Sequence, residues 1–195
     1  ELSVIHALRF HSRSFYRADA QSPAERWPAL IAAVTDADGA VTGVQRTYLQ
    51  RDGSAKAPLA TPRKAMGVLV GNAARFGMVH DIMAVGEGIE TVLSLQCLTP
   101  SMPMAAALSA QNLGAFQLPA TLKRLYIAAD RDEAGVSAAM HLRRRAAEHG
   151  VDAVIILPIL KDFNDDLRQA GRVAMMDSLT AQIDPRDRAT HFARR

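Results

Sequence analysis

The chain has 195 residues, 49% of them hydrophobic and 22% charged, which are the proportions of an ordinary soluble globular protein and exclude a disordered one. Its single cysteine, Cys97, excludes an internal disulfide framework and a cysteine-based zinc site, and suits a reducing cytoplasm. No apolar run approaches the about 18 residues of a membrane span, and the first residues lack the layout of a signal peptide. We therefore expect a cytoplasmic protein with no membrane partner.

Positive charge is concentrated in the first part of the chain. Residues 1–80 hold 10 Lys and Arg against 6 Asp and Glu, whereas residues 81–195 hold 13 against 14. A basic excess is compatible with nucleic acid binding, but an excess of this size equally fits a solvated surface. Charge alone leaves both interpretations open.

The first part of the chain has the pattern of β-hairpins. β-type runs at about 29–35 and 41–49 flank the turn Asp36-Ala37-Asp38-Gly39, and a second turn follows at 51–54. Runs separated by such turns predict antiparallel hairpins. Prolines and glycines between 58 and 77 predict an irregular connection. We expect a smaller, basic α+β subdomain with antiparallel hairpins at 1–79.

After this point, short apolar runs alternate with helix-like segments. The runs lie at 82–85, 104–108, 125–129 and 154–157, and the segments between them at about 89–98, 111–117 and 134–148. Alternation of this kind predicts parallel strands joined by right-handed helical crossovers. We therefore expect residues 80–195 to form an α/β domain, with a Rossmann-like parallel sheet of about four strands, flanking helices and further helices at the C-terminal end.

Acidic residues follow three of these four predicted strands. They are Glu87 and Glu90 after the first, Asp130 and Asp132 after the third, and Asp162, Asn164, Asp165 and Asp166 after the fourth. Each cluster alone fits helix capping, for which Asp, Asn and Glu are favoured. Because the carboxyl ends of parallel strands share one edge of a sheet, the clusters together predict one site of oxygen ligands for Mg²⁺ or Mn²⁺. Such a site commonly handles phosphates.

Two familiar motifs do not explain these residues. Gly86 and Gly88 lack the third glycine of a dinucleotide-binding loop, and the intervening Glu87 would oppose a pyrophosphate. Asp130 and Asp132 begin like an EF-hand loop, but the twelfth position, where a carboxylate is required, is a histidine.

The same residues resemble a known domain. Glu87-Gly88 after an apolar strand, Asp130-x-Asp132 followed by Ala134-Gly135, and Lys161-Asp162-x-Asn164-Asp165 are similar to the Toprim domain of bacterial-type primases, topoisomerases and some nucleases, over roughly 80–170. More narrowly, "GEGIETVLSL", "KDFNDDL", "GVQRTYLQRDGSAKAP" and "GNAARFG" resemble the primase-like Toprim proteins of phages, plasmids and integrated mobile elements, some of which are fused to helicases.

The resemblance implies roles for the acidic residues. Glu87 would be the catalytic acid or base, and Asp130, Asp132 and Asp162 would hold the divalent metal, the first two thereby joining in catalysis. Glu87 could itself be a ligand, and the sequence leaves these two roles open. A neutral Asn stands where primases often carry a further aspartate, so Asp165 is the candidate replacement ligand.

The function implied is that of a DNA primase catalytic core, which uses Mg²⁺ or Mn²⁺ and nucleoside triphosphates to make short primers on a single-stranded DNA template. A replicative helicase or a helicase domain is the further expected partner. The cations expected to contact nucleic acid or nucleotide are Arg46, Lys56, Arg63, Lys64 and Lys161. A metal-dependent Toprim nuclease of DNA or RNA, which would activate water with the same carboxylates, and a non-catalytic nucleic-acid-binding module remain open. A topoisomerase is disfavoured, since the chain is too small to gate DNA.

Overall fold

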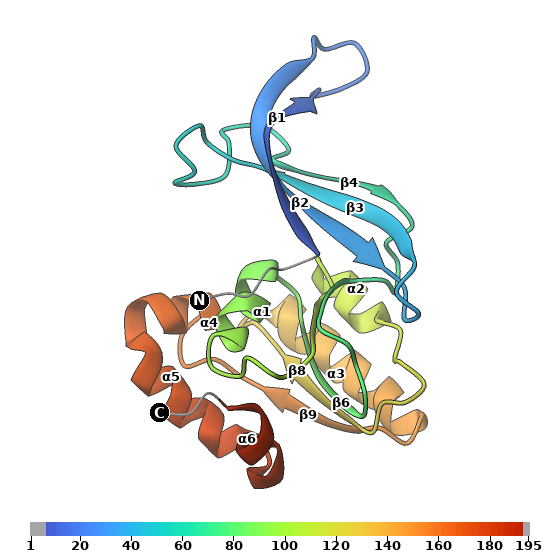
Figure 1. Cartoon of the computed structure of the whole chain (residues 1–195), viewed down its shortest axis with the longest axis vertical. Helices are drawn as coiled ribbons and strands as arrows, with labels where there is room; N and C mark the ends of the chain where they lie inside the picture. Colours follow the sequence, from blue (N-terminus) through green and yellow to red (C-terminus); the bar gives the residue numbers. More distant parts are fainter. Residues whose placement is uncertain (1–6, 193–195) are drawn as a thin grey trace.

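The computed structural model of the chain describes residues 7–192. These residues form a four-stranded sheet and a five-stranded sheet, and the first lies above the second in Figure 1. Helices accompany only the five-stranded sheet.

The first four strands form an antiparallel sheet in chain order. They are β1 (Leu8–Tyr16), β2 (Glu25–Thr35), β3 (Val41–Tyr48) and β4 (Arg63–Gly67). The turn between β2 and β3 is closed by Asp36, whose Oδ1 accepts a hydrogen bond from the Ala40 amide at 2.9 Å, and Gly39 supplies the left-handed conformation there with φ 88°. The predicted hairpin is confirmed.

The structure corrects the sequence prediction for this part in two ways. Residues 7–79 contain no helix, so the expected α+β composition is replaced by strands alone. The stretch 58–77, expected to be irregular, contains β4 and β5 (Ala74–Phe76), and β1 was not predicted. β1 and β4 are largely exposed, so their sequences lack the apolar alternation that identifies a strand.

The second sheet has the strand order β5-β7-β6-β8-β9. Its remaining strands are β6 (Ile82–Gly86), β7 (Met104–Ala106), β8 (Arg124–Ala128) and β9 (Asp152–Ile156). These four are parallel, which confirms the predicted parallel sheet, and β5 adds an antiparallel edge strand beside β7. β5 lies before residue 79, in the part of the chain expected to form the first subdomain, yet it pairs in this second sheet. The predicted boundary between two domains at residue 79 stays a prediction.

Helices cover both faces of the five-stranded sheet (Figure 1). α2 (Ala110–Ala115) and α3 (Glu133–Glu148) pack on one face, and α1 (Ile89–Gln96) and α5 (Gly171–Gln182) on the other. The shorter α4 (Phe163–Asp165), the π-helical turn η1 (Asp166–Ala170) and α6 (Pro185–His191) complete the C-terminal part. Each face has its own apolar core, so the sheet is fixed from both sides and its carboxyl edge is a rigid base for side chains.

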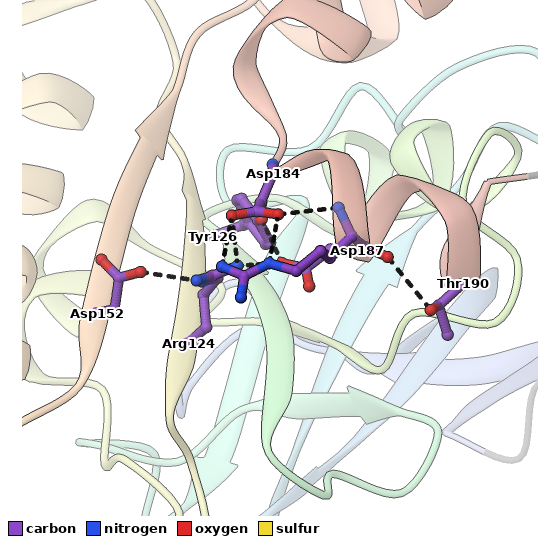
Figure 2. Close-up of polar contacts among 7 residues, drawn as sticks. Arg124, Tyr126, Asp152, Asp184, Asp187 and Thr190 are labelled. Carbon is purple, nitrogen blue, oxygen red and sulfur yellow. Dashed lines mark hydrogen bonds and ion pairs between the residues drawn. The ribbon is translucent and has the colours of Figure 1, made fainter.

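A polar network attaches α6 to the sheet (Figure 2). Asp187 of α6 is buried and accepts hydrogen bonds from Tyr126 Oη at 2.5 Å and Arg124 Nη1 at 2.9 Å. Arg124 also pairs with Asp152 at 2.9 Å and Asp184 at 3.1 Å. Burial and the hydrogen bond to Asp187 raise the pKa of Tyr126 to about 12, which keeps the phenol protonated as a donor. No helix within residues 7–192 is long and apolar enough to cross a membrane.

Candidate active site

Glu87 lies at the carboxyl end of the central strand β6, and the segment after β7 holds it in place. Its backbone carbonyl accepts a hydrogen bond from the Leu108 amide at 2.7 Å. Leu108 has φ 75°, a left-handed conformation that is rare for a residue other than glycine and is commonly found at functional sites. The Glu87 carboxylate accepts a hydrogen bond from the Ala110 amide. One connection therefore orients both the backbone and the side chain of Glu87.

The surroundings of Glu87 make its carboxyl group a better base than an exposed glutamate. Burial raises its pKa, and the negative charge of Asp132 raises it further. The Arg63 guanidinium and the hydrogen bond from Ala110 act in the opposite direction, but the net shift of the pKa is upward. A carboxylate whose pKa moves toward neutral accepts a proton more readily in a transition state.

The predicted carboxylates lie close together, as their effect on the pKa of Asp130, two residues after β8, indicates. Its pKa is raised to about 6, first by burial, then by the negative charges of Glu87 and Asp162, and by that of Asp132. A hydrogen bond from Thr91 Oγ1 at 3.4 Å lowers the pKa only in part. The three acidic clusters of the sequence therefore lie within electrostatic reach of one another at one sheet edge.

Asp132 and Asp162 each cap a helix with one carboxylate oxygen. Asp132 Oδ1 accepts a hydrogen bond from the Gly135 amide at 2.8 Å at the start of α3, and Asp162 Oδ1 accepts one from the Asp165 amide at 2.8 Å at the start of α4. Within the described residues, neither Oδ2 makes a hydrogen bond. Capping and metal binding are therefore compatible, since each aspartate keeps one oxygen for a ligand.

The last residue of the Asp130-x-Asp132-x-x-Gly motif, Gly135, has to be a glycine for steric reasons. A Cβ atom at Gly135 would lie 2.8 Å from the backbone oxygen of Asp130, closer than real side chains approach. Only glycine lets α3 begin this close to the end of β8. The motif therefore fixes the position of both aspartates relative to the sheet edge.

The acidic group fits a divalent cation in chemistry but is not gathered into a finished ligand set. Hard oxygen donors suit Mg²⁺ or Mn²⁺, and the raised pKa of Asp130 reflects burial first and then the repulsion by Glu87 and Asp162, which a cation would relieve. Within residues 7–192, no three His, Cys, Asp or Glu side chains lie close enough together to hold a metal ion. Metal binding would therefore turn these side chains toward one another.

Asp165 is placed differently from the other predicted ligands. Its Oδ1 accepts a hydrogen bond from Gln169 Nε2 at 3.0 Å, and its charge is not among the largest causes of the pKa shift of Asp130. Asn164, considered in the sequence as a poor ligand, lines the same cleft as Glu87. The role of Asp165 as a ligand stays a prediction.

The loop that carries Asp162 is supported by a buried carboxylate. Asp166 is fully buried and accepts hydrogen bonds from the amides of Ile159 and Leu160, both at 2.7 Å. The exposed Lys161 takes part through its backbone, whose carbonyl accepts a hydrogen bond from the Arg131 amide at 2.8 Å. This bond joins the loops after β8 and β9, which carry the aspartates.

A cleft of about 590 Å³ lies between the two sheets, and Glu87 is in its wall. Of the predicted cations, Lys56 and Arg63 line it, and Arg63 Nη2 lies 3.5 Å from Glu90 Oε1. Arg168 of η1 also lines the cleft and was not predicted. Its position six residues after Asp162 was a signal that the sequence offered, since the acidic loop leads directly into that turn.

The other two predicted cations of the first sheet lie on its opposite face. Successive side chains of a strand point to opposite faces, and Arg46 and Lys64 line a separate pocket. Lys64 Nζ donates to the Ala18 carbonyl at 3.1 Å and lies 4.9 Å from the centre of the Tyr16 ring. The Arg46 guanidinium lies 6.0 Å from the centre of the Tyr48 ring. Of these four cations, Lys56 and Arg63 line the cleft with Glu87 and the other two do not, and the contacts of all four with nucleic acid or nucleotide stay predictions.

Two family models match the chain. The Toprim domain matches residues 82–173, and a domain of unknown function, DUF7146, matches residues 1–76. No curated protein sequence matches the chain.

Solved structures of primases are similar in fold. A DNA primase domain from Pseudomonas aeruginosa has a TM-score of 0.59 at 14% identity, covering 90% of this chain and 65% of that one. The primase fragment of the bacteriophage T7 primase-helicase protein has a TM-score of 0.55 at 14% identity, covering 81% and 63%. The Aquifex aeolicus primase, with its zinc-binding and RNA polymerase domains, has a TM-score of 0.55 at 16% identity, covering 80% and 40%.

The chain thus spans less than two thirds of each of these three solved chains. At such identities the similarity shows a shared fold, and together with the Toprim match it confirms the resemblance found in the sequence. Residues 82–173 thus match the Toprim domain, and the chain shares its fold with solved primase domains.

Proposed function

We propose that this chain is the catalytic core of a bacterial-type DNA primase, which joins nucleotides into short primers on single-stranded DNA by metal-dependent nucleotidyl transfer. The observation that supports this most is the cleft between the two sheets, where Glu87 shares a wall with Lys56, Arg63 and Arg168. A base and a set of cations in one cleft suit a reaction between a hydroxyl group and a triphosphate.

In this proposal Glu87 is the proton acceptor. The 3′ hydroxyl of the growing primer attacks the α-phosphorus of the incoming nucleotide, its proton passes to Glu87, and pyrophosphate leaves with the electrons of the broken P–O bond. The raised pKa of Glu87 supports the role, and the hydrogen bond from Ala110 holds the carboxylate in one orientation.

Asp130, Asp132 and Asp162 would hold the divalent ion, with Asp165 as a further candidate ligand. Toprim domains generally bind divalent metal ions, and an all-oxygen donor set favours Mg²⁺ or Mn²⁺. When bound, the ion would offset the charge of the phosphates and favour the ionised hydroxyl. The negative charges of these aspartates would favour the binding of a cation at this edge of the sheet.

The cations divide between substrate and template in this proposal. Lys56, Arg63 and Arg168 contact the triphosphate in the cleft, because they share its walls with Glu87. Arg46, Lys64 and Lys161 lie outside that wall and would contact the phosphates of the single-stranded template.

The proposed setting is DNA replication in the cytoplasm, in a mobile element, with residues 1–79 and 80–195 as the two working parts. The proposed partners are single-stranded DNA, nucleoside triphosphates and a replicative helicase or helicase domain. One structural relative is a fragment of a primase-helicase protein, which supports the last of these.

Incubation with single-stranded DNA, labelled nucleotides and Mg²⁺ or Mn²⁺ tests the proposal. We expect short labelled products that grow with time, disappear with a chelator, and are absent with Asp132→Asn. Shortening of the DNA instead would favour the Toprim nuclease, which uses the same carboxylates to activate water. DNA binding with neither reaction would leave a nucleic-acid-binding module and contradict the proposed activity.

A further inference from the structure

A second, mostly apolar pocket of about 320 Å³ adjoins the cleft, and we call it the side pocket. Its walls come from β3, β4, the segment after β4, the segment after β7 and α2. The residues that line it include Gln45, Leu69, Leu108, Gln111 and Ala115. Gln45 and Leu108 line both the side pocket and the cleft, so the two spaces share a boundary next to Glu87.

Hydrogen bonds make the side pocket a preformed feature. Asn112, which is buried in its floor, accepts a hydrogen bond from the Gly71 amide at 2.6 Å. Its Nδ2 donates to the carbonyls of Asn72 at 2.8 Å and Ala107 at 2.7 Å. One side chain therefore binds the segment after β4 to the end of β7, and holds the pocket open without a ligand.

Gln45 is the unexplained polar group of this pocket. It is only 9% exposed, and its side chain makes no hydrogen bond within residues 7–192 and opens onto the side pocket, since its amide atoms are not among the fully buried unpartnered atoms. Thr47, 7% exposed and two residues further on the same face of β3, lines the cleft and likewise has no side-chain hydrogen bond in the described part. An amide that opens onto an apolar pocket without a protein partner is available to pair with a ligand there.

The chemistry of the walls restricts what the side pocket can hold. Among residues 7–192, no lysine, arginine, aspartate or glutamate lines it, so a phosphate or a metal ion finds no counter-charge from them there. Leu69, Leu108 and Ala115 offer apolar surface for a flat face, while the amides of Gln45 and Gln111 offer both donors and acceptors. A neutral, planar group with polar edges satisfies both features.

We propose that the side pocket receives a nucleobase, whose polar edge pairs with the Gln45 amide, while the phosphates of the same nucleotide unit lie in the cleft near Lys56, Arg63 and Arg168. The inference rests on the proposed function, since it names a recognition element of the same site. The pocket is at the small end of the roughly 300–1,000 Å³ of ligand sites, which suits one base rather than a whole nucleotide. An amide that can donate or accept tolerates more than one base.

The test compares two variants that each remove an unpartnered amide. Gln45→Leu removes the amide in the side pocket. The control, Gln96→Leu, removes one whose buried Oε1 also lacks a partner but which lies at the far end of α1. Calorimetry with Mn²⁺ then measures the affinity of the whole chain for nucleoside triphosphates and, as a probe without a base, for inorganic tripolyphosphate.

We expect Gln45→Leu to weaken triphosphate binding about 10-fold or more, leave tripolyphosphate binding unchanged, and keep or raise the Tm, whereas Gln96→Leu changes neither affinity. An equal loss for both ligands, or none for any base-containing ligand, would overturn the inference. A loss seen only with single-stranded DNA, and not with an abasic strand of the same length, would assign the base to the template and support it.

These measurements need no turnover, so they separate the inference from the proposed function. Base-dependent binding through Gln45 without primer synthesis would contradict the primase activity alone. Primer synthesis with nucleotide and DNA affinities that ignore Gln45 would contradict the side pocket alone.

Discussion

The two sheets differ in how they are held together, and the difference separates stability from substrate contact. The five-stranded sheet has an apolar core on each face, whereas the buried members of the four-stranded sheet's own cluster, among the residues that the structure describes, are Tyr16, Ala29, Tyr48 and Ala57. That sheet instead exposes large apolar side chains such as Phe10 and Phe15. The carboxylates therefore lie on the five-stranded sheet, which we call the rigid part. Most of the residues expected to contact substrate lie on the four-stranded sheet, which we call the thin part because its core is smaller.

The first way to sharpen this comparison is to remove a proposed metal-binding carboxylate from the five-stranded part. Asp132→Asn keeps the oxygen that caps α3, so the fold should persist while metal-dependent activity falls at least roughly 100-fold. Primer synthesis and circular dichroism, measured together, check this. Asp38→Asn in the exposed β2–β3 turn is the matched control and should change neither. Full activity of Asp132→Asn would remove Asp132 from the mechanism.

The second compares packing in the two parts. Leu142 of α3 is fully buried, so Leu142→Ala should lower the free energy of unfolding by about 2–5 kcal/mol. Phe15 of β1 is 58% exposed, and Phe15→Ala should cost less than about 1 kcal/mol. Urea unfolding of both variants gives the two values. Equal losses would show that the four-stranded sheet is as strongly packed as the other.

The third compares the two faces of the four-stranded sheet. Replacing Lys56 and Arg63 by Gln should reduce primer synthesis about 10-fold, since both line the cleft with Glu87. Replacing Arg46 and Lys64 by Gln should affect synthesis less but weaken single-stranded DNA binding, with the slope of log K against log salt falling by about 0.7 per lost phosphate contact. If both pairs act alike, the division of the cations is wrong.

The smallest effect concerns the pH dependence of stability. The pKa of Asp130 is raised to about 6 from 3.8, so its stabilising contribution is fully present below pH 3.8 and is lost as pH rises through 6. Because this carboxyl is partly exposed, the loss should be only about 1 kcal/mol. In metal-free buffer, Asp130→Asn should therefore gain Tm relative to the parent between pH 5 and 7.5. An identical pH profile for both proteins would contradict the repulsion inferred at this edge.

The sequence predicted the rigid part better than the thin one, for physical reasons. β6 and β8 are short apolar runs that are followed closely by Glu87 and Asp130. The local sequence therefore indicates both that these strands are buried and that acidic residues follow them. β1 and β4 are exposed, and their pairing depends on neighbours distant in the chain. Arg46 lies on the face of its sheet that is away from Glu87. Which face it occupies depends on strand register, and local sequence patterns do not determine register.

Other parts of the site were not predictable in the same way. The position of Gln45 in the wall of the side pocket becomes visible only once the packing around β3 is known, and the left-handed conformation of Leu108 has no glycine to signal it. Sequence motifs thus located the carboxylates, while the structure supplied the cleft and the side pocket.

The role of Glu87 is the central claim, and one variant tests it. Glu87→Gln keeps the size of the side chain but removes the group that accepts the proton. We predict that turnover in the primer assay is nearly eliminated, while the affinity for Mn²⁺, measured by calorimetry on the free protein, stays within about three-fold of the parent. Loss of Mn²⁺ binding would make Glu87 a ligand, and preserved turnover would contradict its role as the base.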